Sequence, residues 1–211
     1  MKLLFASRNR GKLAEVNRLL AGSGWQVMSL DDLHGGIELV ENGSSFEENA
    51  RMKARQAVEL AAAVVPEGER DRFWVLADDS GLEVDALGGE PGVRSARYAG
   101  PGASDADRTR QLIERLAVLP AGRRTARFRC AMCLVAPGGA ERLFEGRVEG
   151  SIAGEPRGAA GFGYDPVFVP GGYDRTFAEL GLDIKNQVSH RAAAMRAVVA
   201  YLATVRSGQS A

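Results

Sequence analysis

FWVLADDSG, residues 73–81, sets five apolar residues directly before two carboxylates, a serine and a glycine. A short apolar run bounded by turn residues is typical of a buried strand, and open α/β sheets bind ligands beyond the carboxyl ends of their strands. The same order occurs earlier, where the apolar stretch Leu3–Ala6 precedes a polar loop at Ser7–Lys12 and then leucine and valine at helical spacing. This alternation predicts an α/β fold.

Capping residues, alternation and glycine-rich turns predict the remaining elements of the chain. They are a helix from a capping box at Ser45–Glu48 to about Val65, a continuation of the strand at 73–77 over Leu82–Leu87, a helix from Ser104 to Pro120, two antiparallel strands at Thr125–Ala136 and Glu141–Glu149, a strand at Val167–Val169, and a last helix from about Ser189. No repeat or linker interrupts them, so we expect one domain over residues 1–211, built as two lobes that share a central sheet.

The composition excludes several function classes. The 27 basic and 27 acidic residues balance, so no net charge exists to hold a nucleic-acid polymer or an anionic membrane. Apolar runs such as Leu60–Val65 are far below the about 18 residues that span a bilayer. Arg8 and Arg10 interrupt the apolar start before it reaches the length of a secretory signal. We therefore expect a soluble, cytoplasmic protein.

Cys130 and Cys133 are the only cysteines and form a lone C-x-x-C inside the predicted strand Thr125–Ala136. Such a motif can be a redox pair or half of a zinc site. Residues three apart in a strand point to opposite faces, however, and only two histidines exist to complete a metal site. A structural role is the better interpretation.

Only four of the 27 basic residues are lysines, so the positions where lysine occurs are informative. Lys12 ends the polar loop that begins at Ser7, between a strand and a helix N-terminus, where free N–H groups and the helix dipole favour an anion. Ser7 and Asn9 add donors. The pattern predicts a phosphate-binding loop, with a plain turn and a basic surface as the alternative. It is not a Walker A loop, because the early glycine and the Ser or Thr after the lysine are missing.

Asp78 and Asp79 supply the oxygen ligands that Mg²⁺ prefers, and one of them can accept a proton from an attacking water. Asn49 and Lys53 are four residues apart and share a face of the predicted helix, and Glu41 lies in the loop before it as a further metal-binding carboxylate. The alternative for Asp78 and Asp79 is a turn that uses them for local hydrogen bonds.

Two further carboxylates, Glu47 and Glu48, stand at the start of the same helix. There they satisfy backbone donors and complement the helix dipole. For Glu48 we expect capping to be at least part of its role.

The run Gly161–Pro166 sets glycines around Phe162, so that a flat ring can approach the backbone and stack on the phenylalanine. Lys185 follows, and His190 and Arg191 occupy the first turn of the last helix, whose donors would prefer a carbonyl oxygen over an amino group. A tight turn around a core phenylalanine is the alternative. The coincidence of the two segments favours a base-binding site.

Seven motifs, taken in order, resemble those of the inosine triphosphate pyrophosphatase family, the dITP/XTP pyrophosphatases that remove non-standard purine nucleotides. They are Ser7-x-Asn9-x-x-Lys12, Ser45-Phe46-x-Glu48-Asn49-Ala50 with Lys53, Asp78-Asp79-Ser80-Gly81, Ala86-Leu87-Gly88-Gly89-x-Pro91-Gly92, Ser95-Ala96-Arg97-Tyr98, Gly161-Phe162-Gly163-Tyr164-Asp165-Pro166 and Ser189-His190-Arg191. The resemblance extends from about Lys2 to Leu202.

The resemblance implies an elongated, two-lobed α/β fold with the active site in the cleft between the lobes, usually a homodimer. It implies Mg²⁺-dependent hydrolysis of dITP, ITP or XTP between the α and β phosphates, which yields the monophosphate and pyrophosphate. It assigns Asp79 as proton acceptor and metal ligand, beside Asp78, with Glu41 as second ligand. The implied phosphate-binding residues are Ser7, Arg8, Asn9, Arg10, Gly11, Lys12 and Lys53. The implied contacts to the rest of the substrate are Ser80, Phe162, Gly163, Tyr164, Asp165, Lys185, His190 and Arg191.

Selectivity would rest on donors that face the 6-oxo group of hypoxanthine or xanthine, because the amino group of adenine would leave them unpaired. No residue that rejects guanine is apparent. Arg8 and Arg10 stand where the family often has smaller residues, and Glu47 adds a carboxylate beside Glu48. Two other classes stay open: a pyrophosphatase for pyrimidine nucleotides, against which the base-binding run argues, and a nucleotide-binding protein without catalysis, against which the carboxylates argue.

Overall fold

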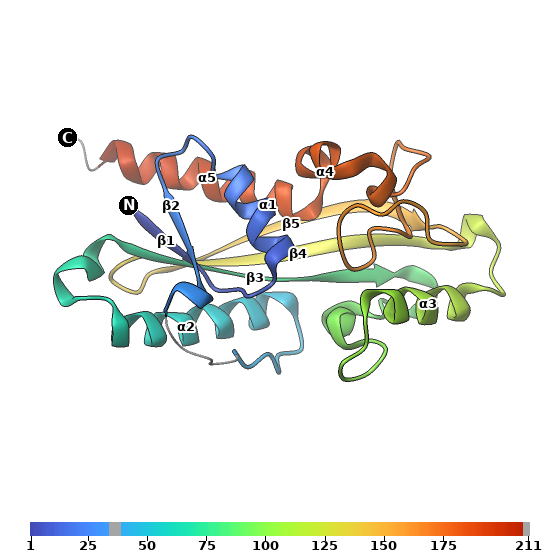
Figure 1. Cartoon of the computed structure of the whole chain (residues 1–211), viewed down its shortest axis with the longest axis horizontal. Helices are drawn as coiled ribbons and strands as arrows, with labels where there is room; N and C mark the ends of the chain where they lie inside the picture. The colour runs from blue at the N-terminus through green and yellow to red at the C-terminus, as the bar shows by residue number, and fades with distance from the viewer. Residues whose placement is uncertain (34–38, 209–211) are drawn as a thin grey trace. The chain divides into compact units, whose positions relative to one another are not determined.

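The computed structural model describes residues 1–33 and 39–208, without the side chains of 70–72 and 206–208. In this part of the chain six strands form one sheet in the order β2-β1-β3-β4-β5-β6, with helices flanking it (Figure 1). The sheet is mixed, because β1 pairs in parallel with β2 and β3 whereas β5 and β6 pair antiparallel. The predicted α/β class is confirmed.

The described strands are β1 (Lys2–Phe5), β2 (Gln26–Ser29), β3 (Phe73–Val84), β4 (Thr125–Val135), β5 (Glu141–Ile152) and β6 (Phe168–Pro170). The α-helices are α1 (Arg10–Leu19), α2 (Phe46–Val64), α3 (Asp105–Leu116), α4 (Phe177–Val188) and α5 (His190–Gly208). Short 3-10 turns are η1 (Leu30–Leu33), η2 (Glu67–Arg72), η3 (Asp85–Leu87), η4 (Gly92–Arg97) and η5 (Ala121–Arg123). Among the described residues, none of these helices combines the length and apolar character that crossing a bilayer requires.

The chain divides into two compact units. Unit 1 contains Met1–Asp79, Cys130–Glu145 and the residues from Ala193 onward, and unit 2 contains Ser80–Arg129 and Gly146–Ala192. The strands β3, β4 and β5 and the helix α5 contribute residues to both units. Each unit has a hydrophobic core of its own.

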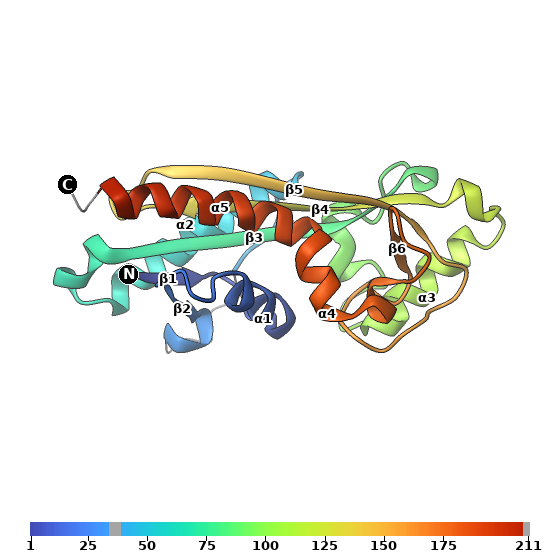
Figure 2. The same ribbon diagram turned by 90° about the horizontal axis from the view of Figure 1, so that it is seen from above.

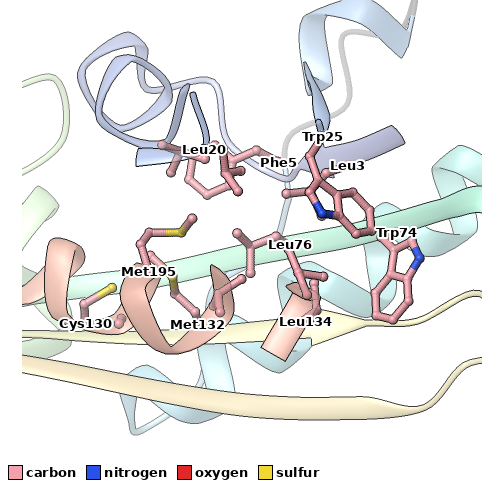
Figure 3. Packing of buried hydrophobic residues seen from close by; sticks show 14 residues of the cluster. Leu3, Phe5, Leu20, Trp25, Trp74, Leu76, Cys130, Met132, Leu134 and Met195 are labelled. Carbon is pink, nitrogen blue, oxygen red and sulfur yellow. The ribbon is translucent and has the colours of Figure 1, made fainter. Parts of the chain in front are cut away.

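The core of unit 1 forms because alternate residues of each strand point to the same face of the sheet. Apolar side chains of β1, β3 and β4 lie on one face and are covered by α1 and α5, as Figure 3 shows for Phe5, Leu76, Met132 and Met195. Helix α2 covers the opposite face (Figure 1). It does so through four fully or almost fully buried alanines at helical spacing, Ala50, Ala54, Ala57 and Ala61.

The core of unit 2 is aromatic. The ring of Phe168 lies 4.7 Å from that of Phe128 and 5.4 Å from that of Phe177, centroid to centroid. Helix α3 contributes Leu112 and Leu116, both fully buried. One extended residue, Ser189, separates α4 from α5 (Figure 2). Buried residues of α3 and α4 share this core with Tyr164 and Val167, which places the two helices beside the segment that carries the glycine-rich run.

One strand, β2, and one α-helix, α4, were not predicted from the sequence. Strand β2 has only four residues and lies at the edge of the sheet, so it offers little alternation to detect. Helix α4 begins with a complete capping box between Thr176 and Glu179, a signal that the sequence does contain. Its helical spacing is broken at Gly181, where φ is 77°, and the interruption hides the periodicity.

The two cysteines point to opposite sides of β4, as predicted. Cys130 lies in the core beneath α5 (Figure 3), whereas Cys133 interacts electrostatically with Arg51 and Arg55 of α2. Both are buried and neither forms a disulfide, and burial raises the pKa of Cys133 to about 11. A thiol that stays protonated near neutral pH is a poor nucleophile, so the structural interpretation holds for this residue.

Candidate functional site

The two acidic residues of the FWVLADDSG stretch lie inside β3 and not at its end. The prediction that the strand stops before them was wrong, because β3 runs without a break from Phe73 to Val84. The strand that ends here is β1: its last residue, Phe5, pairs with Leu76, and the chain then leaves the sheet. Asp78 and Asp79 therefore lie just beyond the carboxyl end of β1, where ligands of α/β sheets bind.

The loop after β1 passes directly into helix α1. Asn9 is the N-cap, and its side-chain oxygen accepts a hydrogen bond from the Lys12 N–H at 3.0 Å. Ser7 Oγ accepts from the Asn9 N–H at 3.2 Å. Arg10, Gly11 and Lys12 thus form the first helical turn, so the predicted phosphate loop is half loop and half helix N-terminus. The helix dipole favours an anion at this position.

Lys12 reaches back from α1 to β3. Its Nζ lies 3.1 Å from a carboxylate oxygen of Asp78, whose side chain is completely buried. The side chain of Lys12 keeps 15% of its exposure, so the ammonium group is accessible from solvent while it neutralises a buried charge. The pairing gives Lys12 a fixed direction, which an exposed lysine lacks.

Lys53 of α2 lies among three carboxylates. Its Nζ is 2.7 Å from Glu41 and 3.8 Å from Asp79, and Asp78 also attracts it. Asn49, one helical turn earlier on the same face, donates from Nδ2 to Asp79 at 2.8 Å. Lysine and asparagine thus hold Asp79 from two sides, as the shared helix face predicted.

Burial and charge act in opposite directions on this cluster. Burial raises the pKa of Asp79 above its ordinary value, although Lys53, Lys12 and the hydrogen bond from Asn49 oppose it. Burial alone would lower the pKa of Lys53, but Asp78, Asp79 and Glu41 together raise it. Lys53 is therefore a fixed positive charge, whereas Asp79 is a carboxylate that binds a proton more readily than an exposed one.

The start of α2 is capped only in part as predicted. Ser45 Oγ accepts from the Glu48 N–H at 3.1 Å, but the main hydrogen bonds to the Glu48 carboxylate come from Ser44 N and Oγ, at 2.7 and 2.8 Å, and not from Ser45. These hydrogen bonds lower the pKa of Glu48. Glu48 thus serves the helix start, as expected.

The predicted base-binding residues lie together in unit 2. Asp165 Oδ2 accepts from the Phe162 N–H at 2.9 Å and from Lys185 Nζ at 2.5 Å. Asp165 and Lys185 are each about 98% buried. Residue 161 must be glycine, because its φ is 83° and a Cβ there would lie 2.1 Å from the Asp165 carboxylate.

Phe162 is half-buried, and two cations lie against its ring. Lys185 Nζ is 4.2 Å and the guanidinium carbon of Arg191 is 5.8 Å from the ring centroid. Contacts of this kind orient an aromatic ring through its quadrupole. The two cations orient the ring of Phe162, and the stacking of a base on it stays a prediction.

His190 and Arg191 begin α5 and are both buried. His190 stacks on Phe128, with ring centroids 4.7 Å apart and planes 11° from parallel. Arg191 donates to Ser80 Oγ at 2.8 Å. The three residues that the sequence analysis selected from segments far apart in the chain, Ser80, Lys185 and Arg191, thus belong to one group with Phe162 in unit 2.

Two residues that hold this group, Ser95 and Asp105, were not predicted from the sequence. The Tyr164 hydroxyl donates to the carbonyl of Ser95 at 3.0 Å, and burial raises the pKa of Tyr164, so the phenol remains a donor. The Gly163 N–H donates to Asp105 Oδ2 at 2.7 Å. Asp105 was not selected because an acidic residue at the start of a helix is ordinarily explained by capping. Ser95 lies in one of the seven motifs, but its backbone carbonyl leaves no mark in the sequence.

The site residues therefore form two sets. Unit 1 holds Ser7, Arg8, Asn9, Arg10, Gly11, Lys12, Glu41, Lys53, Asp78 and Asp79, and unit 2 holds Ser80, Phe162, Gly163, Tyr164, Asp165, Lys185, His190 and Arg191. Within unit 1 the two arginines are exposed, and Arg8 lies 3.6 Å from Asp31. The first set is rich in cations and carboxylates, the second in aromatic and hydrogen-bonding groups.

Comparison with known proteins shows the family to which the chain belongs. The model of the Ham1 family matches residues 3–201. The chain belongs to the Ham1 family. A relative from Symbiobacterium thermophilum, named dITP/XTP pyrophosphatase, is 48% identical over 92% of this chain and 91% of its own length. A Bacillus subtilis protein of the same name is 45% identical over 92% of each chain.

Solved structures of the Ham1 family share the fold. The HAM1 protein from Coxiella burnetii aligns with a TM-score of 0.83 at 37% identity, over 97% of this chain and 99% of that one. The family assignment confirms the resemblance on which the sequence analysis relied.

Proposed function

We propose that this Ham1 protein hydrolyses non-standard purine nucleoside triphosphates, namely dITP, ITP and XTP, to the monophosphate and pyrophosphate. The names of the relatives support a nucleoside triphosphate pyrophosphatase. The observation that carries the proposal is the buried cluster of unit 1, where Lys12 and Lys53 pair with Asp78 and Asp79. In this proposal the two lysines bind phosphate and Asp79 accepts a proton, so both tasks belong to unit 1.

The phosphates bind to unit 1 in this proposal. The first turn of α1 presents backbone N–H groups with the positive end of its dipole, and Ser7 lies beside it. Lys12 and Lys53 neutralise the charge that grows on the leaving pyrophosphate. Both lysines are held by carboxylates, so little reorganisation is needed when the anion arrives.

Asp79 acts as the proton acceptor. It orients a water toward the α-phosphorus, a bond forms between the water oxygen and that phosphorus, and the bond from the α-phosphorus to the bridging oxygen breaks. The electron pair leaves with pyrophosphate, and the water proton goes to the carboxylate. The raised pKa of Asp79 suits this role, because a base with a pKa nearer to the working pH holds the proton better.

Mg²⁺ is the cofactor that the donor set suits. Glu41 and Asp79 both offer carboxylate oxygens near Lys53, and in the part of the chain that the structure describes no three histidine, cysteine, aspartate or glutamate side chains are placed so that they could hold a metal ion together. Mg²⁺ commonly binds one or two carboxylates and completes its shell with water and substrate phosphates. The chain's residues therefore fit, with Glu41 and Asp79 as the ligands. When bound, the ion would stabilise negative charge on the phosphate oxygens.

The base binds to unit 2 in this proposal. Phe162 offers the ring on which a purine stacks, and the donors of Lys185, His190 and Arg191 favour a 6-oxo group. Adenine would leave a buried donor unpaired. The family resemblance further predicts a homodimer that acts on the cytoplasmic nucleotide pool, which light scattering on the purified protein and fractionation of cells would test.

Pyrophosphate release from dITP, XTP, dATP and dGTP, measured in parallel with Mg²⁺, tests the proposal. We expect release from dITP and XTP and little from the other two. Release from all four would leave the pyrophosphatase but remove the selectivity argument. No release from any, with nucleotide binding intact, would favour a binding protein.

The variants Asp79→Asn and Asp78→Asn separate the two carboxylates with a matched change of charge. We expect Asp79→Asn to abolish most turnover while nucleotide binding is retained, because Asp79 is the proton acceptor. Equal, mild effects of the two variants would exclude this assignment.

A further inference from the structure

Asp105 is the first residue of α3, where an acidic side chain normally serves only the helix. The capping box of α3 is complete without it: Ser104 Oγ accepts from the Asp107 N–H, and Asp107 Oδ2 accepts from Ser104 N at 3.1 Å and from Ser104 Oγ at 2.6 Å. Asp105 instead accepts from the Gly163 N–H, 58 residues further along the chain.

The hydrogen bond to Gly163 is one of several that hold residues 161–166, the segment that is proposed to bind the base. The Phe162 N–H is held by Asp165, the Gly163 N–H by Asp105, and the Tyr164 hydroxyl by the Ser95 carbonyl. Gly163 is in the left-handed region, with φ of 62°. Asp105 comes from outside the segment and binds the backbone of Gly163, the residue that follows Phe162.

Arg108 fixes the direction of Asp105. One of its terminal nitrogens donates to the carbonyls of Ala96, at 3.1 Å, and of Ala103, and the other donates to Asp105 Oδ1. The Arg108 side chain is only 17% exposed, whereas that of Asp105 is 46% exposed. One carboxylate oxygen is thus held by a fixed guanidinium group, which leaves the second oxygen aimed at the Gly163 N–H.

We infer that Asp105 is a positioning residue for base recognition. Held by Arg108, it fixes the Gly163 backbone and so the height and tilt of the Phe162 ring on which the purine stacks. The inference rests on the proposed function, since it assigns the base to this segment. It adds a specificity role to a residue that touches no substrate in the proposed binding mode.

The experiment compares Asp105→Ala with the control Asp107→Ala, which removes the capping carboxylate of the same helix and leaves Gly163 untouched. Three quantities are measured: KM and kcat for dITP, inhibition by inosine monophosphate, and inhibition by tripolyphosphate. For Asp105→Ala we expect KM for dITP and the inhibition constant of inosine monophosphate to rise about tenfold, the size of one lost hydrogen bond to a charged acceptor. We expect kcat and tripolyphosphate inhibition to change less than about twofold. Asp107→Ala should lower thermal stability without either effect.

Asp105→Asn is the second variant, because an amide oxygen can still accept from the Gly163 N–H although the charge for Arg108 is lost. We expect it to restore most of the inosine monophosphate affinity. Equal behaviour of Asp105→Ala and Asp107→Ala, or equal weakening of inosine monophosphate and tripolyphosphate, would overturn the inference. If the wild-type protein releases no pyrophosphate, the proposed function fails, and the two inhibitors used as binding probes still decide the role of Asp105.

Discussion

Replacing Lys53 by methionine tests the electrostatic design of unit 1, because it keeps the length of the side chain and removes its charge. Lys53 is 5% exposed and lies 2.7 Å from Glu41 and 3.8 Å from Asp79. Without it, the two buried carboxylates Asp78 and Asp79 lose one of the cations that attract them, and Lys12 remains.

The expected loss follows from the distances. Two unit charges about 4 Å apart attract by about 4 kcal/mol at an effective dielectric constant of about 20. Removing one partner of a buried pair costs about 3–5 kcal/mol in practice. Glu41 is one-third exposed and partly screened. We therefore expect Lys53→Met to lower the free energy of unfolding at neutral pH by about 3 kcal/mol, at the lower end of this range.

The loss should depend on pH in a stated direction. Burial raises the pKa of Asp79 above its ordinary value and Lys53 opposes that rise, so the variant raises this pKa further. A carboxyl group with a higher pKa in the folded state destabilises the protein above its unfolded pKa, and the penalty grows as pH rises from the unfolded to the folded pKa and is constant above it. The deficit of Lys53→Met should therefore be largest near neutral pH and shrink in acid.

Urea unfolding of the wild type, Lys53→Met and Lys2→Met, at pH 7 and near pH 4.5, measures both effects. Lys2 pairs with Glu69 at the surface, with both side chains more than 40% exposed, so the same substitution there should cost less than about 1 kcal/mol. A deficit of Lys53→Met that equals that of Lys2→Met, or that is the same at both pH values, would refute the reasoning.

Two further outcomes follow from packing. Gly161→Ala should weaken inhibition by inosine monophosphate more than tenfold and lower stability, because a Cβ at residue 161 would collide with the Asp165 carboxylate. Gly163→Ala should cost only the strain of a positive φ, because a Cβ there has no atom within 4 Å. Similar effects of the two variants on inhibitor binding and melting temperature would contradict this. Cys133, with its pKa raised to about 11, should stay unmodified by iodoacetamide at pH 7.5 in the folded protein and react once urea unfolds it. Rapid labelling of the native protein, counted by mass spectrometry, would contradict its structural role.

Elements whose signals are local could be predicted from the sequence. The helices α1, α2, α3 and α5 follow from capping residues and from apolar spacing within one segment. Alternation in β4 predicted that Cys130 and Cys133 face opposite sides, because a strand reverses side-chain direction at every residue. The edge strand β2 is too short to show alternation. In helix α4 the periodicity is interrupted at Gly181.

The candidate site could be predicted in its membership but not in its connections. The scarcity of lysine selected Lys12, Lys53 and Lys185, and each of them is paired with a carboxylate. The sequence also placed Asp78 and Asp79 beyond the carboxyl end of a strand, although the strand that ends there is β1 and not β3. Where a strand ends depends on the adjacent strands with which it pairs, and these are not visible in its own sequence.

The sequence by itself therefore determined the fold class, most helices and the kinds of side chain that the site contains, because helix caps and periodicity act over a few residues. Only the tertiary structure decided the partners: Lys12 with Asp78, 66 residues apart, and Asp105 with Gly163, 58 residues apart. Coulomb attraction and hydrogen bonding are short-ranged in water and strong only where packing removes water. Which groups meet in such places is settled by how the strands and helices pack, and no local pattern encodes it.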